Sequence, residues 1–420
     1  MREMKDSGIE WIGEIPKEWK IDKIKYHLKR NEPKNHGNAI VLSVYRDYGV
    51  IPKDSRDDNH NVTSEDTSKY KYVKKGQLVI NKMKAWQGSL AVSDYNGIVS
   101  PAYFIYDFTD EEYNHKYFHY LVRSCYKEEF KRISGGIREG QWDLSPEAFA
   151  NTLALLPPLV EQKYIANYLD IQCSEIDATA EDIQKEISLL EEYKKSVITE
   201  AVTKGLNPDA EMKDSGIAWI GEIPKDWKVD KIKYHLKRNE PKNHGNAIVL
   251  SVYRDYGVIP KDSRDDNHNV TSEDTSKYKY VKKGQLVINK MKAWQGSLAV
   301  SDYDGIVSPA YFIYDFIDEE YNHKYFHYLV RSCYKEEFKR ISGGIREGQW
   351  DLSPEGFSNT LVLLPSIEEQ NEILDYILQK EIEIDAIIAD KKRQRGILTE
   401  YKKSLIYEYV TGKKEVPVHE

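Results

Sequence analysis

The side chains best suited to chemistry in this chain are lysines, arginines and glutamines gathered in one basic stretch. Residues 20–90 carry 15 Lys and Arg against 8 Asp and Glu, a net charge of +7, although the whole chain has a formal net charge of −8. Lys and Arg neutralise phosphates, and Arg and Gln can form paired hydrogen bonds with the edges of guanine and adenine. We therefore expect contacts with double-stranded DNA from this stretch and from a glycine-rich loop at 134–142, where the backbone can approach a groove closely. The candidate residues, each of which recurs 208 positions later, are Arg46, Lys53, Arg56, Lys82, Lys84, Gln87, Arg138 and Gln141, with Arg254, Lys261, Arg264, Lys290, Lys292, Gln295, Arg346 and Gln349.

Some of these residues, and two nearby tryptophans, also have structural explanations that do not involve DNA. Lysine-rich strands are often only solvated sheet edges. Trp86 and Trp142 are more typical of a core than of base stacking. Arg56 follows Asp54 and precedes Asp57, so local charge pairing also explains it.

Motifs of the expected catalytic sites are absent from the sequence. It has neither the Asn/Asp-Pro-Pro-Tyr/Phe motif of amino methylation nor a Gly-x-x-x-x-Gly-Lys-Ser/Thr phosphate loop. The segment 208–213 superficially resembles the carboxylates and lysine of a nuclease, but a single residue separates its acids, which is too tight to hold a metal from a strand pair. We therefore expect a protein that is not an enzyme and has neither cofactor nor metal site. The histidines of the first copy have no zinc-ligand spacing: His27, His36, His60, His115 and His119.

The elements that position these residues occur twice. Residues 3–156 recur at 211–364 without insertion or deletion, and only eight of the 154 positions differ. A period this long is not that of a solenoid, whose units have about 20–50 residues. The chain therefore presents one binding surface in two copies. The differing pairs are Glu10/Ala218, Glu18/Asp226, Ile21/Val229, Asn96/Asp304, Thr109/Ile317, Ala148/Gly356, Ala150/Ser358 and Ala154/Val362.

Each copy has the pattern of an α+β domain. An extended lead-in broken by Gly and Pro comes first, and its Trp11 and Trp19 are expected to pack on the domain. A helix is predicted at about 114–132, where apolar residues share one face. Short β-like runs bounded by turn residues are predicted at 39–45, 70–73, 77–81, 89–93, 102–106 and 153–156.

A long amphipathic helix is predicted after each copy. Residues 161–203 contain no Gly or Pro, and ~43 residues of helix would span about 65 Å. A second helix is predicted at 369–410, and unlike the globular copies the two helices have diverged. Antiparallel pairing would bury both stripes and place the globular copies at opposite ends of a rod; the alternative is that each helix folds back on its own domain. The expected coiled-coil seams comprise Ile176, Ala180, Ile183, Ile187, Leu190 and Val197, and Ile384, Ile387, Leu398, Tyr401 and Leu405.

Composition bounds the class of protein. The chain is 40% hydrophobic and 31% charged, as expected of a soluble globular protein. It has no apolar run of 18 residues and no leader-like start, so we expect neither a membrane span nor secretion. Its three cysteines form no disulfide framework, and a cytoplasmic location fits.

Four motifs occur in the same order in both halves: the lead-in at 6–16, the segment 81–90, the run 138–144 leading into 155–162, and the helical sequence Glu-Tyr-Lys-Lys-Ser at 192–196. Together they resemble the DNA-specificity (S) subunit of type I restriction–modification systems. The resemblance covers essentially the whole chain. It implies two target-recognition domains, each reading half of a split DNA site, and two helices in an antiparallel coiled coil that fix the gap. It also implies docking of two adenine-methylating modification subunits, to which restriction subunits join, and no catalytic centre.

The near-identity of the two recognition domains departs from the family, whose members commonly carry two different ones. Equal readers related by a pseudo-two-fold axis predict an interrupted palindrome as target, with half-sites about one helical turn, ~34–36 Å, apart. The alternatives are a self-contained methyltransferase or endonuclease with a fused reader, and a dimeric scaffold with no nucleic-acid role. The expected organisation is recognition domain 1 at 1–158, spacer helix 1 at 159–205, recognition domain 2 at 206–366, spacer helix 2 at 367–412 and a tail at 413–420.

Overall fold

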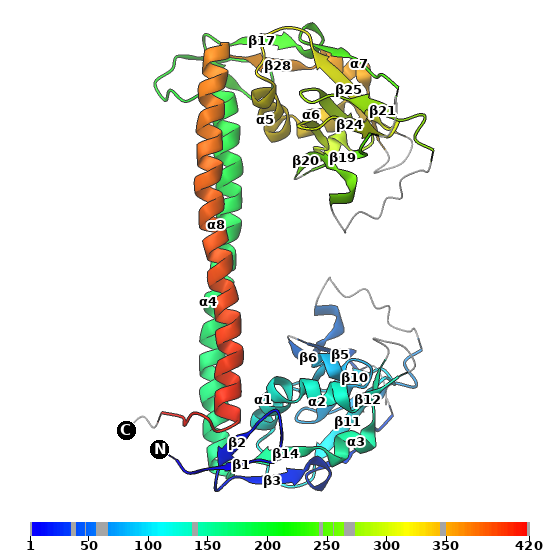
Figure 1. The fold of residues 1–420 in the computed structure, drawn as a ribbon, viewed down its shortest axis with the longest axis vertical. Helices are drawn as coiled ribbons and strands as arrows, with labels where there is room; N and C mark the ends of the chain where they lie inside the picture. Colours follow the sequence, from blue (N-terminus) through cyan, green and yellow to red (C-terminus); the bar gives the residue numbers. More distant parts are fainter. Residues whose placement is uncertain are drawn as a thin grey trace. The chain divides into compact units, whose positions relative to one another are not determined.

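The computed structural model describes residues 2–34, 39–46, 48–55, 66–136, 142–242, 247–254, 256–263, 274–344 and 350–417. The chain divides into two compact units, Met1–Gln184 with Arg393–Glu420, and Lys185–Lys392. Unit 1 contains the first copy of the repeat and unit 2 the second (Figure 1). We describe each unit by itself.

The two copies have the same elements at the same relative positions. The first copy comprises β1 (Met4–Asp6), β2 (Glu14–Pro16), β3 (Lys20–Lys23), η1 (Ile24–Tyr26), β4 (Leu28–Arg30), β5 (Leu42–Tyr45), β6 (Gly49–Pro52), η2 (Lys53–Ser55), β7 (Lys71–Val73), β8 (Leu78–Asn81), η3 (Ala85–Gln87), β9 (Leu90–Val92), β10 (Gly97–Val99), β11 (Tyr103–Phe108), α1 (His115–Cys125), α2 (Lys127–Arg132), β12 (Ser134–Gly135), β13 (Asp143–Leu144), α3 (Pro146–Asn151) and β14 (Leu153–Leu156). The second comprises β15 (Met212–Asp214), β16 (Glu222–Pro224), β17 (Lys228–Lys231), η4 (Ile232–Tyr234), β18 (Leu236–Arg238), β19 (Leu250–Tyr253), β20 (Gly257–Pro260), η5 (Lys261–Ser263), β21 (Lys279–Val281), β22 (Leu286–Asn289), η6 (Ala293–Gln295), β23 (Leu298–Val300), β24 (Gly305–Val307), β25 (Tyr311–Phe316), α5 (His323–Cys333), α6 (Lys335–Arg340), β26 (Ser342–Gly343), β27 (Asp351–Leu352), α7 (Pro354–Asn359) and β28 (Leu361–Leu364).

The central sheet of the first copy is buried on both faces. Its strands are antiparallel in the order β4–β11–β8–β9, with Phe104 opposite Ile80. Because side chains alternate between the two faces of a strand, Phe104 and Tyr106 join the core beside the helices. Tyr103 and Ile105 join a separate core beneath the hairpin β5–β6. The sheet is therefore a rigid support between the helices on one side and that hairpin on the other.

The strands and helices agree with the predicted α+β class, although the bounds of several predicted elements differ from those observed. The strand at 153–156 is correct, whereas the run at 39–45 forms a strand only over Leu42–Tyr45. The helix predicted at 114–132 is interrupted at Tyr126, whose φ of −105° and ψ of 6° end α1 before α2 begins. The lead-in packs as expected, since Trp19 is completely buried.

Two helices of more than forty residues follow the copies: α4 (Leu159–Lys204) and α8 (Ile367–Val410). They run antiparallel within each unit, as predicted (Figure 1). In unit 1, Lys402 of α8 contacts Asp177 of α4 at 2.6 Å, and Arg395 contacts Gln184 at 2.7 Å. In unit 2, Lys194 of α4 contacts Asp385 of α8 at 2.8 Å.

The predicted seam is correct on α4 and partly wrong on α8. Ile183, Ile187 and Val197 are buried on α4. On α8, however, Ile387 is 46% exposed and Tyr401 is 52% exposed. The seam of α8 instead passes through Ile384, Ile388 and Leu405, and its intervening positions include polar residues held by ion pairs, Lys391 with Glu186 and Lys402 with Asp177.

Each globular copy holds the start of one long helix and the end of the other. In unit 1 the buried Trp19 donates from Nε1 to Glu161 at the start of α4 at 3.0 Å, and the Tyr117 hydroxyl donates to the carbonyl of Val410 at the end of α8 at 3.0 Å. Unit 2 repeats both contacts with the helices exchanged. There Trp227 donates to Glu369 of α8 at 2.8 Å and Tyr325 donates to the carbonyl of Val202 of α4 at 3.2 Å.

Candidate nucleic-acid interface

The hairpin β5–β6 presents Arg46 and Tyr48 at its turn. Both side chains are exposed, Tyr48 by 59%. The turn closes at Gly49, whose φ of 72° is in the left-handed region, and a Cβ there would lie 2.9 Å from Nη1 of Arg123. Arg123 on α1 donates from Nη2 to the Arg46 carbonyl. A helix behind the sheet therefore fixes the backbone of the predicted DNA-contacting residue.

A buried imidazole supports the same turn. His119 on α1 accepts a hydrogen bond from the Val92 amide at 3.3 Å, and its Nε2 lies 3.5 Å from Nη1 of Arg123. Burial lowers the pKa of His119 to about 3, and the charges of Arg123 and Lys116 act in the same direction. The imidazole is therefore neutral at physiological pH, and Arg123 carries the charge behind the hairpin.

The turn from β8 to β9 brings Lys84 and Gln87 next to this hairpin. Lys84 is exposed and Gln87 is half-buried on η3. The following Gly88 adopts φ 89°, and a Cβ there would lie 3.9 Å from Cγ of Arg46. Arg46 and this turn therefore form one surface. Met83, 48% exposed between two lysines, belongs to it and was not singled out from the sequence.

The glycine-rich loop joins the same surface through its two ends. Strands β12 and β13 pair on either side of it, with Ser134 opposite Leu144. Lys82 forms an ion pair with Asp143 at 3.0 Å, and the rings of Trp86 and Trp142 lie 5.0 Å apart. Neither tryptophan is fully buried, so their burial does not decide between a core role and base stacking. The tips of the loops lie outside the described residues, and with them Arg56, Arg138, Gln141, Arg264, Arg346 and Gln349.

Lys53 does not join this group. It begins η2 at the opposite end of the hairpin from Arg46, where Leu42 pairs with Pro52. Three residues of strand separate that end from the turn, about 10 Å at ~3.3 Å per residue. Its equivalent Lys261 is 9% exposed. Their place in the fold gives these two lysines less access to a ligand at the turn than Arg46 and Arg254 have.

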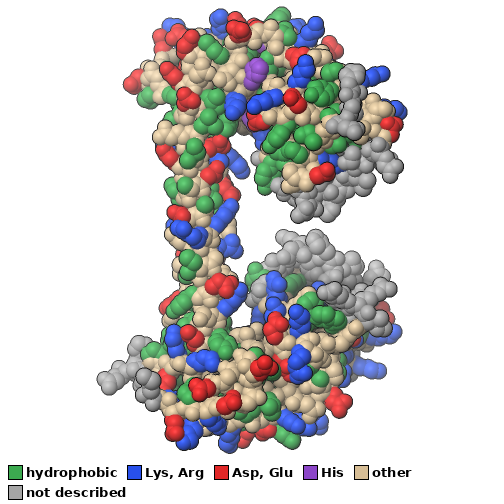
Figure 2. All heavy atoms as spheres, in the orientation of Figure 1, with side chains coloured by type: hydrophobic (Ala, Val, Ile, Leu, Met, Phe, Trp, Pro, Cys, Tyr) green, Lys and Arg blue, Asp and Glu red, His purple; other side chains and the backbone are tan. Residues whose placement is uncertain are grey.

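The second copy presents the same arrangement. Arg331 donates to the Arg254 carbonyl, Lys290 forms an ion pair with Asp351 at 3.0 Å, and the rings of Trp294 and Trp350 lie 5.1 Å apart. Lys292 is exposed and Gln295 is half-buried, as in the first copy. Figure 2 shows Lys and Arg side chains interspersed with Asp and Glu on the face in view, so the charge of that face is mixed.

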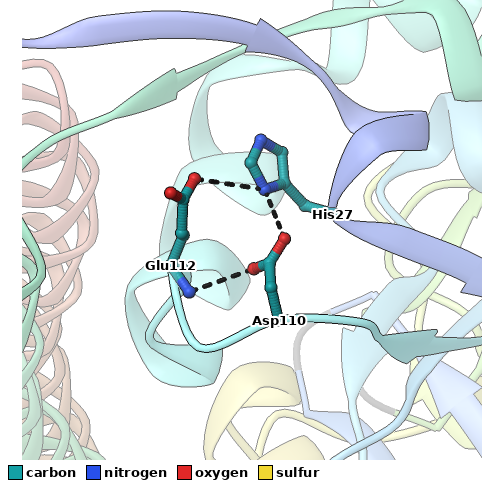
Figure 3. A group of neighbouring side chains, drawn as sticks. All are labelled: His27, Asp110 and Glu112. Atoms are coloured by element: carbon teal, nitrogen blue, oxygen red, sulfur yellow. Dashed lines mark hydrogen bonds and ion pairs between the residues drawn. The ribbon is translucent and has the colours of Figure 1, made fainter.

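A second cluster lies away from this surface and was missed by sequence reasoning. His27 at the end of η1 lies against Asp110 and Glu112 from the loop between β11 and α1 (Figure 3). The spacing of 83 residues between His27 and Asp110 gave no signal that they meet. The same cluster recurs as His235, Asp318 and Glu320.

Comparisons with known proteins identify relatives with the same fold. No protein-family model matches the chain. It is 24% identical over 430 residues to the type I restriction enzyme MjaVIII specificity subunit of Methanocaldococcus jannaschii, which covers 96% of this chain and 94% of that protein. Among solved structures it is similar to a chain from work on complex assembly and conformational transition of the type I R-M system, with a TM-score of 0.68, 13% identity, and coverage of 95% and 99%. The HsdS subunit from Thermoanaerobacter tengcongensis matches with a TM-score of 0.53, 14% identity, and coverage of 95% and 98%.

The chain is similar in sequence and in fold to type I specificity subunits. The resemblance found in the sequence is thereby confirmed, as is the fold class of α/β domains joined by long antiparallel helices. The relatives are named as specificity subunits, which bears out the expectation that the chain is not an enzyme. None of the described helices has the length and apolar character needed to traverse a bilayer.

Proposed function

We propose that this chain is the DNA-reading subunit of a type I restriction–modification complex and recognises a bipartite site. The observation that carries the proposal is the surface made by the hairpin turn, the β8–β9 turn and the ends of the glycine-rich loop. It combines Arg46, Lys84 and Gln87, which can contact guanine, phosphate and adenine respectively. The exposed Met83 adds an apolar contact suited to a thymine methyl group.

We assign the two recognition domains to residues 1–158 and 206–366, the spacers to 159–205 and 367–412, and the tail to 413–420. Equal readers should select equal half-sites, because the residues of the surface are the same in both copies. An inverted arrangement of the half-sites is supported by the antiparallel helices within each unit, since α4 starts in unit 1 and ends in unit 2 while α8 does the reverse. The proposed target is an interrupted palindrome with a non-specific spacer.

Partner docking is proposed at an exposed sequence that the two diverged helices share. Glu192–Ser196 of α4 is identical to Glu400–Ser404 of α8. Within these segments Lys194 and Lys402 form ion pairs with the other helix, whereas Tyr193 is 55% exposed and Tyr401 is 52% exposed, so burial does not explain why the tyrosines are the same. Two equal patches, one in each unit, fit two copies of one partner. We propose that they dock two adenine-methyltransferase subunits, and that restriction subunits join this assembly.

Methylation mapping tests the target. The chain would be expressed with the methyltransferase subunit from its own system in a host without adenine methylation, and modified adenines would be sequenced at single-base resolution. A split motif with the same half-site on both strands is expected. A split motif with unlike halves would overturn the palindrome but keep the bipartite reading, whereas methylation at a continuous motif, or none, would contradict the proposed function. The matched control is the same methyltransferase without this chain, which should leave the DNA unmodified.

A further inference from the structure

His27 has carboxylates at both of its ring nitrogens. Nδ1 lies 2.9 Å from Oδ2 of Asp110 and 3.7 Å from Oε2 of Glu112, while Nε2 lies 3.5 Å from Oδ2 of Asp22 (Figure 3 shows the first two). The side chain of His27 is 4% exposed, and its Nε2 is buried without a hydrogen-bond partner. The second copy has the same distances within 0.1 Å, with His235 at the centre: 2.8 Å to Asp318, 3.7 Å to Glu320 and 3.6 Å to Asp230.

The negative charge at this imidazole is not balanced by the neighbouring side chains. Among the described residues, none of the three carboxylates forms an ion pair with a lysine or arginine. A neutral imidazole carries one proton, so one ring nitrogen would present its lone pair to a carboxylate. The Glu112 carboxylate lies too far from Nδ1 for a hydrogen bond, and it forms no other hydrogen bond within the described structure. It nevertheless points toward Nδ1, which is already hydrogen-bonded to Asp110.

We propose that His27, Asp110 and Glu112 form a divalent-cation site, repeated at His235, Asp318 and Glu320. The ligands are Nδ1 of the imidazole and one oxygen of each carboxylate, three atoms that lie within 4.8 Å of one another. One imidazole with two carboxylates can bind Zn²⁺ as three protein ligands and leave the fourth coordination position to water, the open arrangement known from zinc sites with three protein ligands. The cation balances the carboxylates and leaves the imidazole proton on Nε2.

The residues behind the ligands are those that a metal site needs. A metal-bound histidine usually donates its other N–H to a carboxylate, and Asp22 is placed at Nε2 to accept it. The ligand Asp110 is itself oriented, because the Glu112 amide donates to its Oδ1 at 3.0 Å and leaves Oδ2 facing the imidazole. The buried and unpartnered Nε2 is thus explained as a donor that settles on Asp22 when Nδ1 binds the ion.

A bound ion would fasten the recognition domain to its helix. The loop that carries Asp110 and Glu112 also holds Gln162, a completely buried residue of α4. Gln162 donates to the Glu112 carbonyl at 2.8 Å and accepts from the Asn114 amide at 2.8 Å. The cation would therefore join the segment before β4 to this loop at the start of α4. This proposal does not depend on DNA binding.

Zn²⁺ titration of the metal-free full-length chain by isothermal calorimetry tests the site. Two ions per chain are expected, one for each cluster. The Glu112→Gln variant should bind one Zn²⁺ ion with the original affinity. The variant with both Glu112→Gln and Glu320→Gln should bind no ion with that affinity. These substitutions remove a ligand, and neither glutamate side chain forms a hydrogen bond within the described structure, so the fold should survive, which circular dichroism would check. Asp22→Asn with Asp230→Asn should weaken binding about 10- to 100-fold, as loss of an outer carboxylate does.

The matched control is Glu128→Gln with Glu336→Gln, which removes exposed carboxylates of α2 and α6 remote in sequence from the ligands. Its titration should equal that of the unchanged chain. The proposal is overturned if the unchanged chain takes up no Zn²⁺, or if two ions still bind with unchanged affinity after both Glu112 and Glu320 are replaced. In either case the cluster is an ion-paired histidine and nothing more. No DNA is present in the experiment, so its result does not bear on the proposed function.

Discussion

The two globular copies of this chain are nearly identical to each other, whereas its two long helices differ in sequence. The domains differ at eight of 154 positions, and their strands, their helices and the hydrogen bond that holds the hairpin turn correspond in the two copies. The helices differ along most of their length, including the ends that contact a domain, where Ala201 of α4 corresponds to Tyr409 of α8, but they are identical at the Glu-Tyr-Lys-Lys-Ser segments. The domains therefore act as equal units, whereas the helices fit each other as unlike partners.

The two helices differ most clearly in the residues of their seam near the middle. On α4 the seam is apolar there, with Ile183 and Ile187 buried. The equivalent positions of α8 are Lys391 and Arg395, which contact Glu186 and Gln184 of α4. A helix with this basic segment can pair with α4 but would meet its own charge in a copy of itself.

The largest effect is expected from separating the two halves. Residues 1–205 alone should form a symmetric dimer. In the intact chain Tyr325 donates to the carbonyl of Val202 at the end of α4, and Tyr117 of one copy can donate in the same way to Val202 of a second copy. Lys194 would then pair with Asp177 of the second copy, the equivalent of Asp385. Residues 206–420 should fail to dimerise, since two basic segments would meet. Sedimentation equilibrium distinguishes the outcomes: a monomeric first half, or equally stable dimers of both, would remove the argument from the helices.

Docking through the shared helical segment predicts the next largest effect. Tyr193→Ala with Tyr401→Ala should abolish stable assembly with the methyltransferase subunit, and each single substitution should leave one subunit bound. Both tyrosines are exposed, so the free energy of unfolding should change by less than about 0.5 kcal/mol. Native mass spectrometry of the purified complex counts the bound subunits. Full assembly with both tyrosines replaced would show that the partners bind elsewhere.

Replacing one arginine in one domain should change the base preference in one half-site and leave the other half-site unaffected. Arg46→Ala should relax the base preference in one half-site and Arg254→Ala in the other, each at a cost of about 1–3 kcal/mol in discrimination. Competition binding with half-site substitutions measures the effect. Lys53→Ala, at the far end of the hairpin, is the matched control and should weaken binding equally on all sequences, if at all. Equal loss at every base after Arg46→Ala would reduce that residue to a phosphate contact.

Sequence patterns predicted the long-range organisation better than the local site. The repeat, the α+β class and the antiparallel helices follow from exact recurrence and from heptad spacing, which persist over many residues. The seam of α8 was misassigned at Ile387 and Tyr401 because polar residues held by ion pairs occupy some of its inner positions.

The site required tertiary contacts that no spacing contains. Nothing in the sequence indicates that Arg123 holds the carbonyl of Arg46, 77 residues away, or that Gly88 lies beside the same side chain. Nor does it indicate that Lys53, close to Arg46 in sequence, is separated from it by the length of a hairpin. The meeting of His27 with Asp110 depends in the same way on how β4 pairs with β11.

The smallest expected effect tests whether the two domains are equal in stability as well as in surface. Burial lowers the pKa of His119 and of His327 to about 3, from an ordinary value of about 6.5. Because the folded pKa is the lower one, only the unfolded chain binds a proton as pH falls below about 6.5, and stability is lost progressively toward pH 3. Each imidazole should cost about 1 kcal/mol between pH 7 and pH 5.5.

Urea denaturation at those two pH values, compared with His119→Asn and with His327→Asn, isolates the two histidines from the other titrating groups. Asn keeps an acceptor for the Val92 or Val300 amide but does not titrate. Each substitution should remove the same share of the pH dependence, because burial is the first cause of the lowered pKa in both domains and an arginine, Arg123 or Arg331, the second. A clear difference between the two variants would mean that near-identical sequences have acquired unequal cores, and equal half-sites could then no longer be inferred from sequence identity alone.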